Sequence, residues 1–143
     1  MAFSTVIHFG RDDAQHVKAL RHAGYKVRES KSLNRLLIDL QDENELNAVI
    51  VSEAEPRRAE QAAVLVRHFS GAPLILFRPS HVAIDESRFD RVYSSPVPAA
   101  NWLFDIAVLV MQNKELRADS ERLLKQEQAV RAKTRRQWAP ANA

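Results

Sequence analysis

Short apolar runs of the kind that form β-strands alternate along this chain with longer segments of helical periodicity. The strand-like runs cover five stretches: residues 5–10, 25–29, 48–51, 74–77 and 91–93. The helical segments lie between and after them: residues 12–22, 32–40, 57–69 and a long stretch from about residue 99. Such alternation is built from right-handed crossovers, which place successive strands in one parallel sheet. The sequence therefore predicts an α/β domain.

Individual segments support this architecture. The run Ala48–Val51 is apolar at every position, which is typical of a strand covered by helices on both faces. Ser32 is a suitable N-cap for a helix that carries Leu33, Leu36 and Leu40 at helical spacing. Five such strands fit the flavodoxin-like order, in which the ligand crevice lies at the carboxyl ends of the strands. We expect a five-stranded parallel doubly wound sheet with an extended C-terminal helix.

The composition excludes several kinds of chemistry. Cysteine is absent, which rules out disulfides, thiolate nucleophiles and cysteine-ligated zinc. The formal net charge of +3 is too small to indicate nucleic-acid binding unless the charge is clustered. The N-terminus lacks the basic and apolar regions of a signal peptide. The most apolar stretch, residues 102–111, is shorter than the roughly 20 residues that span a membrane. We expect a soluble, cytoplasmic protein.

Several short motifs resemble the receiver (CheY-like) family of response regulators. Gly24–Val27 resembles the family's Gly-Tyr-x-Val entry into the second strand, and Ala72–Leu76 resembles its Thr-Pro-Val-Ile-Val fourth strand. Pro56 stands four residues after Ser52, which falls at the position of the family's phosphoryl acceptor. Ser95–Pro96 resembles the Lys-Pro pair that closes the fifth strand. The resemblance covers residues 5–111 and implies a signalling domain of the two-component type.

The same resemblance implies that the phosphorylation chemistry is lost. The acidic pair that holds Mg²⁺ in the family falls on Gly10 and Arg11, and the acceptor aspartate becomes Ser52. The hydroxyl residue after the fourth strand becomes Arg78, and the lysine of the fifth strand becomes Ser95. A serine at neutral pH is no nucleophile without a base beside it, and hard divalent cations require carboxylate oxygens. The chain is therefore expected to be a non-enzymatic pseudo-receiver without a catalytic residue.

Other candidate sites are weaker. Asp12 and Asp13 either cap the first helix or, with a shifted register, reach into the pocket. Arg11 and Arg78 either attract an anion there or pair with Glu53 or Asp12. The five histidines include no pair at i and i+4, so no metal site is expected, and no cofactor is indicated. His8, on the first strand, is expected to be hydrogen-bonded or half-exposed.

The segment before the last strand and the last helix both depart from the family pattern. Residues 79–90 have little helical periodicity, so a short or irregular fourth helix is expected. The last helix continues to about Arg136 with no glycine or proline. We therefore expect a pseudo-receiver domain over residues 1–113, a helical extension over 114–136 and a disordered tail over 137–143.

The last helix carries a coiled-coil period. Apolar side chains recur every seven residues, at Trp102, Leu109, Leu116, Leu123 and Val130. On the companion stripe Ile106 is apolar, whereas Asn113, Ser120 and Glu127 are polar. This pattern predicts an interface formed by these five seven-spaced residues and Ile106, either in a homodimer or with an unidentified signalling protein. A helix lying on its own domain is the alternative.

The basic run near the C-terminus leaves one further function open. Residues 131–136 contain four cations and no acidic side chain. Such a run can contact phosphate backbones, which would make the protein a nucleic-acid-binding regulator. It is also typical of a solvated helix end, where cations favour the carboxyl terminus. Since no helix-turn-helix precedes the run, nucleic-acid binding is the second hypothesis, after protein–protein contact.

Overall fold

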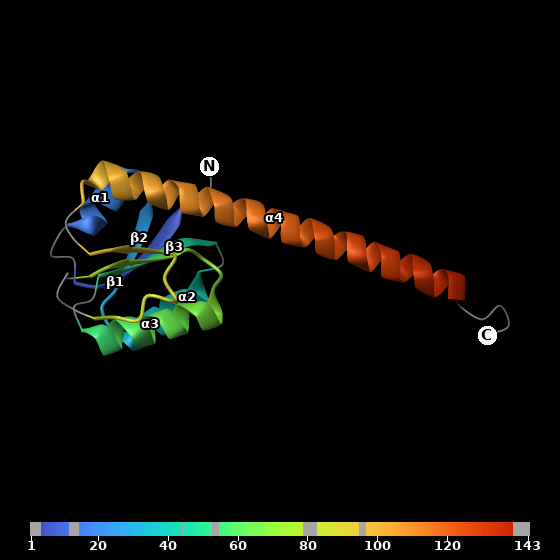
Figure 1. The fold of residues 1–143 in the computed structure, drawn as a ribbon, viewed down its shortest axis with the longest axis horizontal. Helices are drawn as coiled ribbons and strands as arrows, with labels where there is room; N and C mark the ends of the chain where they lie inside the picture. Colours follow the sequence, from blue (N-terminus) through green and yellow to red (C-terminus); the bar gives the residue numbers. More distant parts are fainter. Residues whose placement is uncertain are drawn as a thin grey trace. The chain divides into compact units, whose positions relative to one another are not determined.

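A single parallel sheet of five strands, in the order β2-β1-β3-β4-β5, forms the centre of the domain (Figure 1). The computed structural model describes residues 4–11, 15–43, 45–52, 55–78, 83–94 and 97–138. The strands are β1 (Thr5–Gly10), β2 (Lys26–Ser30), β3 (Leu46–Ser52), β4 (Leu74–Phe77) and β5 (Arg91–Tyr93). The helices are α1 (His16–His22), α2 (Leu33–Asp42), α3 (Pro56–Phe69) and α4 (Ala99–Trp138). The predicted fold class is confirmed, with β2 and β5 at the two edges.

Helices cover both faces of the sheet, with α2 and α3 on one face and α1 with the first turns of α4 on the other (Figure 1). The side chains of each inner strand alternate between the two cores, as the period of two in a strand requires. In β3, Val49 and Val51 pack toward α2 and α3, whereas Ala48 and Ile50 pack toward α1 and α4. This two-sided burial is the reason why β3 is apolar without interruption.

Local signals in the sequence explain how the helices begin. The Ser32 hydroxyl accepts a hydrogen bond from the Arg35 backbone N–H at 3.1 Å, which caps α2 as expected. Pro56 occupies the first turn of α3, where its missing N–H leaves no intrahelical bond unmade. Gly24, with φ of +99°, makes the turn from α1 into β2, a conformation that side-chain-bearing residues rarely adopt.

Two predicted segments differ in their bounds. Residues 83–90 contain no helix, and the rest of the expected fourth-helix region, 79–82, lies outside the described residues. The last helix runs through Trp138, so positions 137 and 138 are helical rather than part of the tail predicted to be disordered. The remainder of that tail, 139–143, lies outside the described residues, as do 12–14 before α1.

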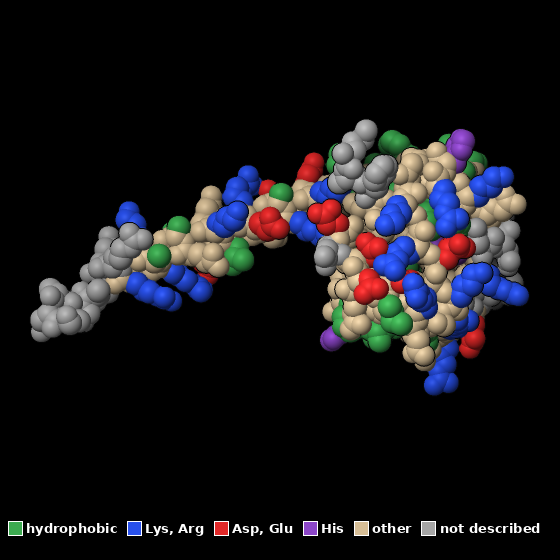
Figure 2. Space-filling model, turned by 180° about the vertical axis from the view of Figure 1, so that it is seen from behind, with side chains coloured by type: hydrophobic (Ala, Val, Ile, Leu, Met, Phe, Trp, Pro, Cys, Tyr) green, Lys and Arg blue, Asp and Glu red, His purple; other side chains and the backbone are tan. Residues whose placement is uncertain are grey.

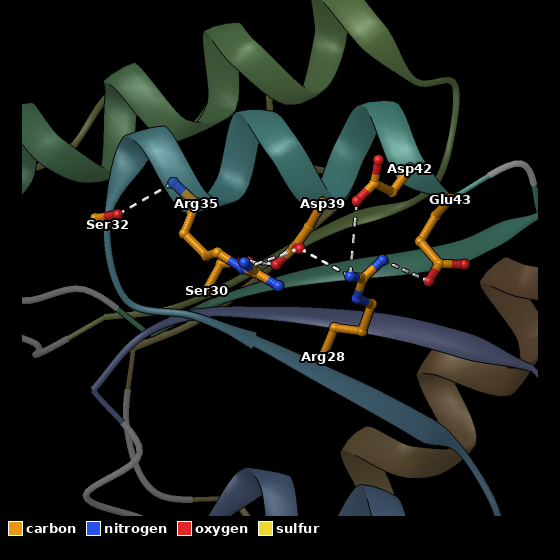
Figure 3. Close-up of polar contacts among 7 residues, drawn as sticks. All are labelled: Arg28, Ser30, Ser32, Arg35, Asp39, Asp42 and Glu43. Atoms are coloured by element: carbon orange, nitrogen blue, oxygen red, sulfur yellow. Dashed lines mark hydrogen bonds and ion pairs between the residues drawn. The ribbon is translucent and has the colours of Figure 1, made fainter.

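An ion-pair cluster fixes α2 to the edge strand β2 (Figure 3). The Asp39 carboxylate is 1% exposed and accepts a hydrogen bond from the Ser30 hydroxyl at 2.6 Å. Its second oxygen lies 3.2 Å from a guanidinium nitrogen of Arg28 and 3.2 Å from one of Arg35. Arg28 also pairs with Glu43 at 2.9 Å. Because a buried charge is costly unless it is paired, this cluster ties the orientation of α2 to β2.

The chain divides into two compact units, residues 1–110 and 111–143. The first unit contains the sheet, α1 to α3 and the opening turns of α4. In the second unit every side chain from Lys114 to Arg135 is exposed. Across the described part of the chain, none of the helices combines the length and apolar character needed to cross a bilayer.

Candidate functional site

The carboxyl ends of β1 and β3 lie side by side, and the described members of the predicted degenerate pocket lie at the carboxyl edge of the sheet. Gly10 pairs in register with Ser52, and the Arg11 backbone N–H donates to the Ser52 carbonyl oxygen at 3.0 Å. Arg78 directly follows β4, where its backbone N–H donates to the Tyr93 carbonyl oxygen at 3.0 Å. Ser95 lies outside the described residues.

Two histidines converge on the Ser52 side chain. His8 Nε2 lies 3.0 Å from Ser52 Oγ, and His16 Nδ1 lies 3.2 Å from the same oxygen. His8 projects from β1 and is 1% exposed, whereas His16 opens α1 and is half-buried, as is Ser52. Gln15, the residue before α1, has a left-handed backbone conformation with φ of 56°. The helix begins directly after it, with His16 at this edge.

Aromatic rings extend this cluster toward α4. The His16 ring stacks on Phe77, with centroids 3.9 Å apart, and meets Trp102 edge-on at 5.4 Å. Phe77 in turn stacks on Tyr93 at 5.0 Å. The rings therefore form a continuous packed path from the end of β3 to the first turns of α4.

The Tyr93 hydroxyl donates a hydrogen bond to the Asp105 carboxylate on α4, and Arg91 pairs with the same carboxylate at 3.3 Å. The hydrogen bond from Tyr93, reinforced by Arg91, lowers the pKa of Asp105. Burial, together with this hydrogen bond, raises the pKa of Tyr93. These contacts join β5 to α4 beside the aromatic path.

Arg78 has two partners among the described residues that the sequence did not predict. Its guanidinium pairs with Glu86 at 2.9 Å and donates to the Ser94 hydroxyl at 3.2 Å. The acidic residues with which pairing was predicted, Asp12 and Glu53, lie outside the described residues. Among the residues that the structure describes, no three His, Cys, Asp or Glu side chains are grouped so as to hold a metal ion.

The sequence alone did not associate the histidines with Ser52. The three residues are separated by 8 to 44 positions, and isolated histidines carry no spacing signal. The topology does supply a signal, because the ends of β1 and β3 and the start of α1 all meet at the same edge of a doubly wound sheet. Of the two alternatives expected for His8, the structure shows the hydrogen-bonded one, and the side chain is 1% exposed.

The predicted interface on α4 separates into two parts. Trp102 and Ile106 are 3% and 0% exposed and pack in the domain's own core with Val6, Leu20 and Ile75, which corrects the expectation that these two side chains form an interface. Their burial follows from the sheet face that α4 covers. Leu109 is half-buried against the same core.

The later members of the stripe are exposed. Leu116, Leu123 and Val130 have 65%, 62% and 64% of their surface accessible. Figure 2 shows hydrophobic side chains at separated points along this part of α4, interspersed with charged ones. Leu124 adds a second exposed leucine beside the stripe, at 55%.

The basic end of α4 also carries internal ion pairs. Arg131 pairs with Glu127 one turn earlier, and Arg122 pairs with Asp119. Pairs of this spacing are ordinary features of a solvated helix. The ion pairs of these residues therefore give no support for nucleic-acid binding over a solvated helix end.

No protein-family model matches this sequence, and no curated protein matches it. Solved structures do match. A response regulator receiver protein from Sinorhizobium medicae superposes with a TM-score of 0.65 at 16% identity, over 78% of this chain and 97% of that one. The receiver domain of a sensor histidine kinase from Pseudomonas aeruginosa, with magnesium coordinated in its active-site cleft, superposes with a TM-score of 0.62 at 11% identity. The match covers 76% of this chain and 98% of that one.

A third similar structure extends further along this chain. It is a fusion that contains the trimeric coiled coil of yeast Spc42, with a TM-score of 0.64 at 14% identity, over 94% of this chain and 97% of that one. Identities this low establish the architecture and nothing finer. The sheet order, the helices on both faces and these superpositions together show that the described residues between 4 and 110 have the fold of a response-regulator receiver domain.

Proposed function

We propose that this protein is a non-enzymatic, phosphorylation-independent signalling module that acts by protein–protein contact and self-associates through α4. The observation that carries the proposal is the stripe of Leu116, Leu123 and Val130. Each side chain is more than 60% exposed, and they lie seven residues apart on a helix. Apolar side chains at this spacing are buried when a second helix packs along them.

A second copy of the same chain is the partner that fits this stripe. Symmetric pairing of identical patches is the commonest form of self-association. The fusion with a trimeric coiled coil superposes over 94% of this chain, which supports helical assembly next to this fold. Ser120 and Glu127, on the companion stripe, limit the affinity and favour one register, as isolated polar core positions do in coiled coils.

Independence from phosphorylation rests on the groups at the carboxyl edge. The similar kinase receiver domain holds magnesium in its cleft, whereas here β1 ends at Gly10, Arg11 follows it, and Ser52 ends β3. Neither glycine nor arginine supplies the carboxylate oxygens that Mg²⁺ prefers. These residues support a cytoplasmic interaction module that does not use magnesium-dependent phosphoryl transfer.

Sedimentation velocity of the full chain over a range of concentrations tests self-association. A reversible increase in the sedimentation coefficient up to high micromolar concentration is expected. A monomer throughout that range would contradict the proposal. A gel shift with duplex DNA that weakens steeply with salt would instead favour the nucleic-acid hypothesis.

Mass spectrometry after treatment with acetyl phosphate and Mg²⁺ tests phosphorylation independence. No phosphorylated species is expected, and Mg²⁺ is expected to leave the melting temperature unchanged, because only a ligand that binds the native state stabilises it. Stoichiometric phosphorylation at Ser52 or elsewhere in the domain would contradict this part of the proposal.

A further inference from the structure

The hydroxyl group of Ser52 links the protonation states of two imidazoles. It offers one proton and two lone pairs, and His8 Nε2 and His16 Nδ1 lie 3.0 Å and 3.2 Å from its oxygen. If it donates to one imidazole nitrogen, the other nitrogen must carry a proton and donate to it. A protonated histidine at either position donates to a lone pair, so one added proton is accommodated.

A second added proton is opposed. The two ring centroids are 6.3 Å apart, and His8 is 1% exposed. At an effective dielectric constant near 20, the repulsion between two unit charges at this distance places the two titration midpoints about 2 pH units apart. Burial adds to this effect at His8, because it disfavours the charged form.

The surroundings indicate which histidine takes the proton. His16 is half-buried and stacks face to face on Phe77 at 3.9 Å, and an aromatic face attracts a cation. His8 is enclosed between the sheet and the helices of its face. We therefore expect the first added proton on His16, with His8 neutral.

Among the described residues, several charged groups near this edge pair with one another. Glu29, the neighbour of His8 on β2, pairs with Arg21 of α1 at 3.5 Å. On the β4 side Arg78 pairs with Glu86, and on the side of β5 and α4 Tyr93 and Arg91 bind Asp105. Arg11 is exposed after β1. Among the described residues, the groups that titrate near neutral pH at this edge are the two histidines.

We propose that His8, Ser52 and His16 form a proton-responsive site at the carboxyl edge of the sheet, in which His16 takes up a single proton and Trp102 of α4 responds to it. His16 contacts Trp102 at 5.4 Å, so a charge on this ring is placed directly against the helix that carries the exposed leucines. The proposal goes beyond self-association and does not depend on it.

Nuclear magnetic resonance titration of the histidine Cε1 protons in the full chain tests the proposal without any substitution. The His16 midpoint is expected between pH 5 and 8, and the His8 midpoint about 2 pH units lower. The exposed histidines His22 and His68 lie away from this site and serve as internal reference signals. Two midpoints within half a pH unit of each other, or a His8 that titrates first, would overturn the proposal.

Two matched substitutions test the coupling in opposite directions. His16→Gln removes the first charge, so the His8 midpoint is expected to rise by up to about 2 pH units. His8→Gln removes a neutral group, so the His16 midpoint is expected to change little. An unchanged His8 midpoint in His16→Gln would contradict the coupling, because the repulsion would then be absent.

Fluorescence tests the link to α4. In a Trp138→Phe background Trp102 is the sole tryptophan, and an adjacent imidazolium quenches indole emission. Emission is expected to fall as the pH drops through the His16 midpoint, and His16→Gln is expected to abolish this transition, whereas His68→Gln retains it. A transition that persists in His16→Gln would show that Trp102 reports on a different group.

Discussion

The substitution Leu123→Ala tests whether α4 self-associates through the seven-residue stripe. Complete burial of a leucine side chain contributes about 1.5–3 kcal/mol. Since 62% of Leu123 is exposed, about 1–2 kcal/mol of this remains to be gained at an interface. A dimer loses two such side chains, so the variant is expected to weaken dimerisation by about 2–4 kcal/mol, or roughly 30- to 700-fold in the dissociation constant.

The adjacent residue supplies the matched control. Leu124 is 55% exposed, but it lies about 100° further around the helix, away from the stripe. Leu124→Ala removes the same atoms and is expected to change the dissociation constant by less than about threefold, since flanking positions contribute little. Both variants are compared with the wild type by sedimentation velocity. Equal weakening by the two variants, or none by Leu123→Ala, would refute the reasoning.

Three further substitutions probe the domain itself. Ile106→Ala leaves a cavity under α4 and is expected to lower the free energy of unfolding by about 2–5 kcal/mol in urea denaturation; a loss below about 1 kcal/mol would contradict its burial. Arg28→Ala leaves the buried Asp39 with fewer partners and is expected to cost about 1–3 kcal/mol in the same assay. Asp105→Asn is expected to lower the melting temperature at pH 7, but not once the pH has fallen through the pKa of Asp105, which Tyr93 lowers; an equal loss at both pH values would contradict this.

The architecture could be predicted because its signals are local. The unbroken apolar run of β3 and the alternation of strands with helices each depend on residues close together in the sequence. Ser32 could be identified as a cap for the same reason, since its partner Arg35 is three residues away. The order of the strands follows from the handedness of the crossovers and from the preference for one parallel sheet.

The division of the α4 stripe could not be predicted. A helix that packs on a sheet and a helix in a coiled coil show nearly the same period, since the two repeats diverge by only about 20° per heptad. Trp102 and Leu123 therefore fit one pattern in the sequence, although one is buried in the domain and the other is exposed. The surface that buries Trp102 is formed by strands distant in the sequence, so the sequence of α4 alone cannot predict this burial.

The two edge strands of the sheet affect whether such a module can associate through a helix without aggregating. Unpaired strand edges are templates for edge-to-edge aggregation, and natural proteins protect them with charges or by shortening the strand. Here β2 presents Lys26, Arg28 and Glu29, and β5 is only three residues long. Both edges thus disfavour the addition of a strand from another molecule. Assembly of many copies into continuous sheets is disfavoured, so that a helix can be used for contact at high local concentration without the domain forming fibres.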